Sequence, residues 1–430
     1  MNIPKARWYR ICLTIFFIYL IQNIDRNNIS MAIPSMIEKL NLSATVAGIL
    51  LSAFFWGYVI TQTPGGLLAA KYTAKRVIVT SCILVGSGAI LTGFVTNYNV
   101  LLFLRFFVGL AEGMVWPSLA LLFVNWFPDE ERARAINLVQ MGLPLSAVIL
   151  APLSGWMIST WDYQFMFIAQ GIPAIIIGLI FAFVVFDTPS QDKYLSREER
   201  DYLENNRSTT VKEEGSFKEV ITNPRVWIFA FGWFLWVSGM YGFGLWLPSL
   251  IGQLSSQGIG AVGLLTAIPY VFSIVGMTFF SSLSDKYTKS GQNRSWFVAI
   301  PLLLSGSALI LQHFTNGSSL FLSLLFLVIT AVGLYVTGPF WALVMTCVPR
   351  NQSGAAVGLV NAVGNLGGIV GPIVIGIAAV GNEISSGFYI LGISMVLSGL
   401  IFCTITRKFK IEVAEKEESS LNHVSKSIGS

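Results

Sequence analysis

Residues 66–76 (GLLAAKYTAKR) and residues 281–294 (SSLSDKYTKSGQNR) are two versions of one stretch, and they decide the architecture of the chain. Lys71–Tyr72–Thr73 in the first recurs as Lys286–Tyr287–Thr288 in the second, at an offset of 215 residues. That offset is half of the 430-residue chain, and each stretch follows the second long apolar run of its half. The repeat predicts two halves that are built alike.

Twelve apolar runs surround these stretches, each close to the 20 or so residues that a membrane-spanning helix needs. They cover residues 11–37, 44–69, 77–95, 100–127, 135–159, 164–186, 226–252, 259–283, 296–314, 319–348, 354–380 and 386–406. Charged residues make up only 11% of the chain, and the mean hydropathy is +0.68. The runs are continuous, whereas a β-barrel would show alternating hydrophobicity. We therefore predict an all-α integral membrane protein with twelve transmembrane helices in two pseudo-symmetric six-helix bundles.

A single long polar stretch, residues 187–225, separates six runs from six and carries nine acidic and seven basic residues. Within it, residues 196–206 are typical of an amphipathic surface helix with Ser196 as its N-cap. We expect the stretch as a whole to be a solvated linker. The predicted domains are an N-terminal bundle (1–186), a cytoplasmic linker (187–225), a C-terminal bundle (226–406) and a cytoplasmic tail (407–430).

The basic residues predict the orientation of the chain in the membrane. With both termini in the cytoplasm, 24 of the 27 Lys and Arg residues lie in cytoplasmic segments, and only Lys39 lies outside. This distribution follows the positive-inside rule. The net charge of +5 therefore reflects topology and does not indicate a nucleic-acid partner. The first run continues through Asp25–Arg26 without a small-residue cleavage site, so we expect a retained span and no cleaved signal peptide.

The residue types that serve cofactors and catalysis are sparse. The four cysteines lie in or at the edge of predicted spans, and His313 and His423 lie at a predicted outer helix end and in the tail. Zinc spacings and CxxC are absent, as are the HExxH, GxSxG and P-loop motifs. We expect no cofactor and no metal, and a membrane enzyme is the class that the sequence favours least.

Four charged side chains fall inside predicted spans: Asp25, Arg26, Arg105 and Glu112. A charge at the centre of a membrane helix costs about 2.5–3.5 kcal/mol on insertion scales, so such residues are functional candidates. Asp25 lies 13 residues before Glu38 and Glu112 lies 13 residues after Asn99, both at outer ends of spans, which puts the carboxylates roughly 20 Å deep at 1.5 Å per residue. Arg105 precedes Glu112 by two helical turns on one face. Spans one and four could therefore present these groups at one level.

Each residue type suggests a role. Arginine stays charged and binds a carboxylate through two parallel hydrogen bonds, whereas a buried carboxylate can exchange a proton. The set thus favours an anion held by arginine and a cation, most simply H⁺, carried by a carboxylate. Two alternatives stay open. Asp25 and Glu112 could form buried ion pairs that fix helix packing, and Arg105 could be an arginine that extends to the membrane surface.

Polar residues in other spans are less specific. Tyr58 and Gln62 lie one turn apart in span two, and either could simply bond a neighbouring helix. Trp341 in span ten and Asn361 in span eleven share a depth on either side of a short turn; packing and interhelical bonding are the alternatives for them. The seven glycines of residues 354–376 suit close packing, or a helix that bends as the two halves rock.

Several segments, in order and on matching spans, resemble the major facilitator superfamily and, within it, the anion:cation symporter family. They are YLIQNIDRNNIS (19–30), YVITQTPGGLLA (58–69), RFFVGLAEGMVWPS (105–118), NWFPDEERARA (125–135), NPRVW (223–227), YGFGLWLP (241–248), GPFWAL (338–343) and GLVNAVGNLGGIVGP (358–372). The resemblance covers the chain nearly from end to end. It implies import of a small organic anion, such as a sugar acid, a hydroxy acid or an aromatic acid, with H⁺ usually coupled and Na⁺ left open.

The resemblance also implies roles for residues. Asp25 and Glu112 match proton-coupling carboxylates, Arg26 and Arg105 match substrate and gating arginines, and Tyr58, Trp341 and Asn361 match positions that line the sugar-acid site. It further implies a monomer in a bacterial inner membrane, with no partner beyond its substrate and the lipid bilayer.

The chain departs from the family pattern in places. Lys71 and Arg76 follow span two, where Ala70 replaces the usual Asp of the gate, whereas Asp285 keeps that residue in the second half. Leu143 stands where galactonate-transporting members have a glutamine, which weakens a galactonate assignment and admits a less hydroxylated acid. A proton-coupled exporter and an anion exchanger are the alternatives, although SAVILAPLSG (146–155) lacks the GxxxGP pattern that exporters favour.

Overall fold

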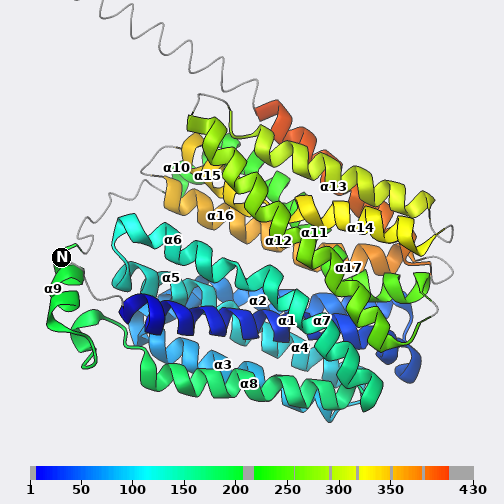
Figure 1. The fold of residues 1–430 in the computed structure, drawn as a ribbon, viewed down its shortest axis with the longest axis horizontal. Coiled ribbons are helices and arrows are strands. Elements are labelled where there is room, and N and C mark those ends of the chain that lie inside the picture. Colours follow the sequence, from blue (N-terminus) through cyan, green and yellow to red (C-terminus); the bar gives the residue numbers. More distant parts are fainter. Residues whose placement is uncertain are drawn as a thin grey trace, which may run out of the picture.

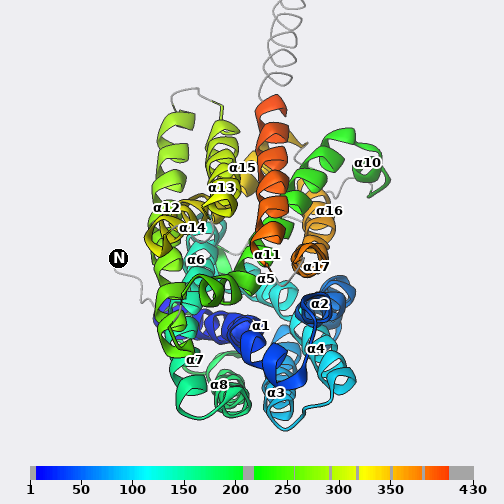
Figure 2. The ribbon, with the colours of Figure 1, turned by 90° about the vertical axis from the view of Figure 1, so that its right-hand side faces the viewer.

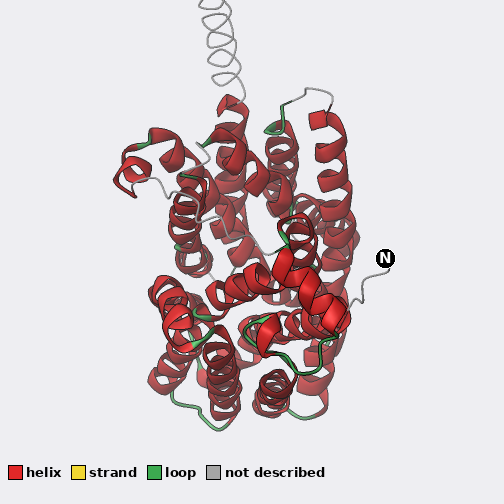
Figure 3. Ribbon diagram, turned by 90° about the vertical axis from the view of Figure 1, so that its left-hand side faces the viewer, coloured by secondary structure: helices red, strands yellow, loops and turns green. Residues whose placement is uncertain are grey.

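The computed structural model describes residues 6–206, 217–255, 257–289, 293–315, 319–348, 352–379 and 383–405. Within these ranges every regular element is helical (Figure 3). Eleven helical stretches are long and apolar enough to cross a membrane. The other expected span, α1 (Leu13–Leu40), has 28 residues, but its middle is polar from Gln22 to Asn28. The predicted all-helical membrane architecture is confirmed.

The helices form two bundles, one from each half of the sequence (Figures 1 and 2). The N-terminal bundle contains the π-helical turn η1 (Arg7–Cys12), α1, α2 (Ala44–Tyr72), α3 (Ala74–Gly93), α4 (Tyr98–Gly113), α5 (Val115–Trp126), α6 (Asp129–Gln140), α7 (Gly142–Thr160) and α8 (Tyr163–Val184). The connection holds η2 (Pro189–Gln191), α9 (Arg197–Asn205) and α10 (Phe217–Thr222). The C-terminal bundle contains α11 (Pro224–Leu254), α12 (Ile259–Lys289), α13 (Trp296–Phe314), α14 (Leu320–Leu334), α15 (Thr337–Cys347), α16 (Ser353–Asn365), α17 (Gly367–Ala378) and the helix Ser385–Ile405.

Four spans are interrupted along their length. The breaks lie at Met114 between α4 and α5, at Met141 between α6 and α7, at Tyr335–Val336 between α14 and α15, and at Leu366 between α16 and α17. The last break falls in the glycine-rich run, for which the sequence predicted either close packing or a helix that bends. Irregular backbone at membrane depth is tolerated only inside the protein or beside a water-filled cavity. We therefore expect these breaks to lie in the interior of the molecule or beside a water-filled cavity.

The two bundles meet at what we call the distal face, the end that carries the α1–α2 and α7–α8 turns. Thr45 donates a hydrogen bond to the Gly376 carbonyl, at 3.1 Å. Beside it, a Cβ atom on Gly48 of α2 would lie only 2.7 Å from the Pro372 carbonyl oxygen of α17. On the other side of the seam, a Cβ on Gly155 of α7 would lie 2.9 Å from the Ile259 carbonyl oxygen of α12. Glycine thus lets backbones from different bundles touch.

The opposite end, the terminal face, carries a set of buried ion pairs around Arg7. The guanidinium of Arg7 bonds Glu131 of α6 at 2.8 Å and Glu199 of α9 at 2.9 Å. Ser196 caps α9 by accepting from the Glu199 amide, which confirms the predicted N-cap. Glu199 and Leu203 are buried, whereas most other residues of α9 are exposed, so α9 is an amphipathic helix at the surface, as predicted. The ion pair between Arg7 and Glu199 binds this part of the connection to the N-terminal bundle.

Candidate functional site

Arg26 and Glu112 form a buried ion pair inside the N-terminal bundle. Arg26 extends from α1, and its Nε donates to Glu112 Oε1 of α4 at 2.8 Å. A second guanidinium nitrogen bonds the same oxygen. Glu112 is 1% exposed and Arg26 is 7% exposed. The structure therefore brings together two of the four predicted membrane charges, one from span one and one from span four.

Arg26 also reaches the C-terminal bundle. Its remaining guanidinium nitrogen donates to the Tyr241 hydroxyl of α11 at 3.1 Å. On its flank the guanidinium carbon lies 4.8 Å from the ring centroid of Tyr58, which stacks on Phe54. A cation over aromatic rings is stabilised by the ring quadrupole. One side chain thus contacts a carboxylate in its own bundle and a hydroxyl across the seam.

Arg105 has a different role from that of Arg26. Its guanidinium donates to the backbone carbonyls of Arg26 at 2.9 Å and of Asp25 at 3.4 Å. The side chain is 3% exposed, so the alternative of an arginine that extends to the membrane surface is wrong. Arg105 holds the backbone of α1 beside the ion pair. The structure therefore indicates that Arg105 positions the backbone of α1.

Asp25 is the isolated member of the set. Both of its carboxylate oxygens are buried and have no hydrogen-bond partner among the described residues, and Glu112 Oε2 is in the same condition. Asp25 and Arg26 are adjacent in sequence and point apart, as a helix requires of neighbours. A buried carboxylate without donors is strongly disfavoured in its charged form. Asp25 and Glu112 are thus two candidate proton carriers in one bundle, only one of them paired with an arginine.

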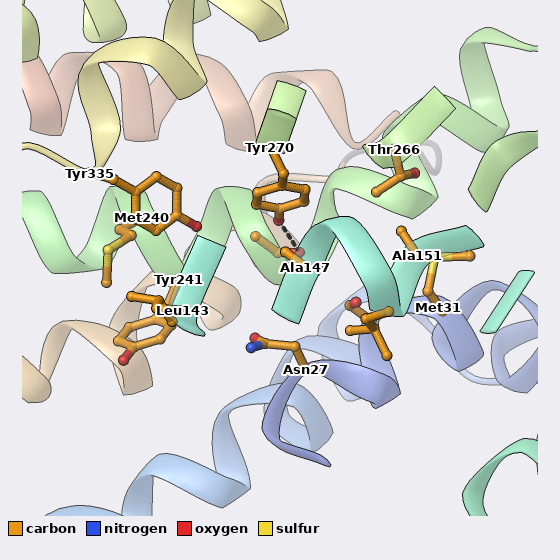
Figure 4. Close-up of a pocket in the computed structure, with 13 residues that line it drawn as sticks. Asn27, Met31, Leu143, Ala147, Ala151, Met240, Tyr241, Thr266, Tyr270 and Tyr335 are labelled. Atoms are coloured by element: carbon orange, nitrogen blue, oxygen red, sulfur yellow. Dashed lines mark hydrogen bonds between the residues drawn. The ribbon is translucent and has the colours of Figure 1, made fainter. Parts of the chain in front are cut away.

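A small cavity lies on the seam next to this set (Figure 4). Its volume is about 30 Å³, which is room for about two water molecules. It is lined by Asn27, Ser30 and Met31 of α1, by Leu143, Ala147, Leu150 and Ala151 of α7, by Met240, Tyr241 and Gly244 of α11, by Thr266 and Tyr270 of α12, and by Tyr335 at the break after α14. Tyr241 belongs both to the wall and to Arg26, so the cavity adjoins the ion pair.

The other predicted site residues lie outside this lining. Trp341 of α15 packs edge-on against Trp233, with ring centroids 5.1 Å apart. Asn361 lies on α16, one turn before Asn365, whose amide donates to Gln62 of α2 at 3.0 Å. Gln62 therefore forms a hydrogen bond with a neighbouring helix, which is one of the two roles that the sequence allowed for it.

The three predicted gating residues lie on helix ends at the terminal face, away from the cavity. Lys71 and Arg76 are exposed at the α2–α3 junction. Asp285 of α12 is exposed and pairs with Arg294 at 3.4 Å.

Sequence reasoning missed Asn27, Tyr241, Tyr270 and Tyr335. Asn27 and Tyr241 lie within quoted motifs, next to Arg26 and at the head of YGFGLWLP, so their positions carried a signal. Tyr270 and Tyr335 carried none, because the folded arrangement alone brings α12 and the break in span ten to the seam. In contrast, Leu143 lies on the cavity wall, at the position where the sequence departs from galactonate-transporting proteins.

Comparison with known proteins supports the transporter reading of this geometry. The sequence profile of the Major Facilitator Superfamily matches residues 15–372 and 255–428. A protein of Agrobacterium vitis named "Putative tartrate transporter" is 30% identical over 93% of this chain and 90% of its own length. One from Escherichia coli named "Probable galactarate/D-glucarate transporter" is 27% identical over 86% and 87%, respectively. These names agree with the organic-acid branch that the motifs resemble.

The fold itself is also shared with a solved structure. A bacterial homologue of the human lysosomal transporter Spinster, in an inward-facing and unoccupied conformation, superposes with a TM-score of 0.74 at 18% identity. The match covers 94% of this chain and 96% of the other. The chain therefore belongs to the major facilitator superfamily, a family of membrane transporters and not of enzymes.

Proposed function

We propose that this protein imports an organic carboxylate together with a proton by alternating access. The observation that carries the proposal is the position of Arg26, which bonds Glu112 within its own bundle and Tyr241 of the other bundle. An anion that enters the seam meets this guanidinium first. The relatives named for tartrate and for galactarate or glucarate support a carboxylate as that anion.

The geometry supplies a reason for coupling. Glu112 and a substrate carboxylate would compete for one guanidinium, since both bind it through charge-assisted hydrogen bonds. When the substrate takes Arg26, Glu112 is left buried without a counter-charge and becomes easier to protonate. Substrate binding and proton binding then favour each other, as symport requires. Asp25, which has no partner, is the second proton carrier in this scheme.

The remaining predicted residues take supporting roles in the proposal. Arg105 positions α1, and Tyr58 packs beside Arg26. Trp341 and Asn361 would reach the substrate once the bundles move, since both lie on spans interrupted near the seam. Lys71, Arg76 and Asp285 would close the terminal face in the opposite conformation.

We further propose that the terminal face is cytoplasmic, in a bacterial inner membrane, and that the protein is monomeric. The excess of Lys and Arg on that side supports this orientation. In that orientation, the contacts at the distal face would close the outer side, as expected of an inward-facing arrangement.

Uptake into liposomes tests the function. The purified full-length protein is reconstituted, and accumulation of radiolabelled carboxylates is measured with the external solution made acidic. We expect accumulation that a protonophore abolishes. Glu112→Gln and Asp25→Asn should lose pH-driven accumulation but retain exchange of labelled for unlabelled substrate. Asp129→Asn is the matched control, because Asp129 is an exposed carboxylate on α6.

Each other outcome has a clear meaning. If both variants still accumulate substrate against its gradient, Glu112 and Asp25 are not the coupling groups. Accumulation that follows a Na⁺ gradient and ignores pH would replace H⁺ by Na⁺. Substrate efflux driven by proton entry would instead identify an exporter.

A further inference from the structure

The cavity on the seam has one cationic neighbour and an otherwise neutral wall. Arg26 reaches it through Tyr241, whereas Arg105 is turned to the backbone of α1. Among the described residues, every buried charged side chain of the two bundles belongs to the N-terminal half. The C-terminal half contributes tyrosines, a threonine, a methionine and a glycine to the wall. The site can therefore neutralise one carboxylate and no more.

Two tyrosines of the C-terminal bundle, Tyr270 and Tyr335, are neighbours on the cavity wall (Figure 4). The rings of Tyr270 and Tyr335 have centroids 6.4 Å apart, and both hydroxyls point inward. Tyr270 donates only a long bond, 3.4 Å, to the Gly244 carbonyl. The Tyr335 hydroxyl has no hydrogen-bond partner among the described residues, although its side chain is 7% exposed. Two hydroxyls in this state can accept a ligand group at little cost in existing bonds.

The rest of the lining is largely apolar, with a few further neutral polar groups. Met31, Leu143, Ala147 and Met240 are among its apolar members, and Asn27, Ser30, Tyr241 and Thr266 are its other polar side chains. An apolar lining with a few placed polar groups is typical of sites that bind a small organic molecule and fix its orientation. The ligand that suits it has a single negative charge at one end and a neutral hydrogen-bonding group at the other end.

We infer that the substrate is a monocarboxylate with a neutral hydroxyl at its far end, and that Tyr270 and Tyr335 select that hydroxyl. This inference rests on the proposed function. A second carboxylate at the tyrosine end would be buried without a counter-charge, which is unfavourable even where hydrogen bonds are available. The cavity holds only about two waters as it stands, so the bundles part to admit the ligand. The tyrosines and Arg26 then face it from opposite bundles.

Matched acids test the inference on the purified full-length protein. Each pair differs only at the far end: 4-hydroxybenzoate and terephthalate, gluconate and glucarate, or threonate and tartrate. Dissociation constants are measured by calorimetry. In any pair that binds, we expect the monocarboxylate to bind at least about tenfold more tightly than the dicarboxylate. Equal or tighter binding of the dicarboxylate overturns the inference but leaves carboxylate transport standing. If no member of any pair binds, the proposed function fails as well.

Tyrosine variants test the assignment of residues. Tyr270→Phe and Tyr335→Phe should each weaken binding of the preferred hydroxy acid by about 2- to 10-fold. For the same acid without its far hydroxyl, such as benzoate for 4-hydroxybenzoate, the two variants should bind like the wild type. Tyr389→Phe is the control, because Tyr389 packs against His313 away from the cavity. An equal loss for both acids would make the tyrosines structural and overturn their role in selection.

Discussion

The two bundles share a helical frame but have opposite interiors. The N-terminal bundle buries Asp25, Arg26, Arg105 and Glu112 near its middle. The C-terminal bundle buries aromatic rings instead: Trp233 stacks on Phe340 with centroids 4.6 Å apart. The same helical frame therefore accommodates a charged interior in one half and an aromatic interior in the other.

The largest effect should come from the buried ion pair. Arg26→Met leaves Glu112 without its partner, which costs about 3–5 kcal/mol for a buried pair. Unfolding of the purified protein measures the loss. Arg294→Met removes the pair with Asp285 in the other half, which is solvent-exposed on the Asp285 side, and should cost only about 0–1 kcal/mol. Similar losses in the two variants would contradict the contrast between the halves.

A smaller effect is expected from helix contacts inside the N-terminal bundle. A Cβ on Gly109 of α4 would lie 1.9 Å from the Phe54 carbonyl oxygen of α2. Gly109→Ala should therefore destabilise the protein by about 1–3 kcal/mol. Gly358→Ala on α16 meets no atom within 4 Å and should be neutral or slightly stabilising. A thermal shift that is equal for the two would show that the close approach of α2 and α4 is not required.

The contact between the bundles can be perturbed without touching either core. Gly48→Ala places a Cβ 2.7 Å from the Pro372 carbonyl oxygen, whereas Gly66→Ala on the same helix has its nearest neighbour at 3.5 Å. The first should favour opening of the distal face, and a strain of about 1–3 kcal/mol shifts such an equilibrium 5- to 150-fold. Labelling of a cysteine introduced at Thr45 reports the opening. Faster labelling with Gly66→Ala alone would contradict the assignment.

The smallest effect should come from the bond between Gln62 and Asn365. Gln62→Ala removes a hydrogen bond that spans the seam at 3.0 Å, worth about 0.5–1.5 kcal/mol. We expect a modest loss of stability and a faster exchange rate, since movement of the bundles breaks this bond. Gly358→Ala is the comparison, because Gly358 lies on α16 with Asn365 and a Cβ there meets no atom within 4 Å. A slower rate for Gln62→Ala would show that the bond aids movement.

Composition and repeat were enough to predict the fold class. Continuous apolar runs admit only helices in lipid, and the repeated Lys-Tyr-Thr stretch divides them into two sets. The sequence also indicated that the polar middle of α1 is a candidate functional segment. The breaks at Met114 and Tyr335 were not predictable, because each falls within a run that is apolar on both sides. Backbone breaks there depend on what the neighbouring helices contact.

The candidate site was predictable in one half only. Asp25, Arg26, Arg105 and Glu112 stand out in the sequence because a charge in lipid is costly. Tyr270 and Tyr335 do not stand out, since a tyrosine in a membrane helix has many ordinary uses. The pairing of Arg26 with Glu112, and the turning of Arg105 to the backbone, followed from side-chain geometry that spacing along one helix does not fix.

The ion pair and the two tyrosines proposed to select the substrate are carried by different helices, and this has an evolutionary consequence. Tyr270 and Tyr335 lie on α12 and after α14, whereas Arg26 and Glu112 lie on α1 and α4. Under the proposed function, substitutions in the second half could therefore change the substrate while the proton-coupling residues of the first half stay unchanged. If an ancestral half was duplicated and the copies diverged in this manner, carriers for many acids could share one set of charged residues in the first half.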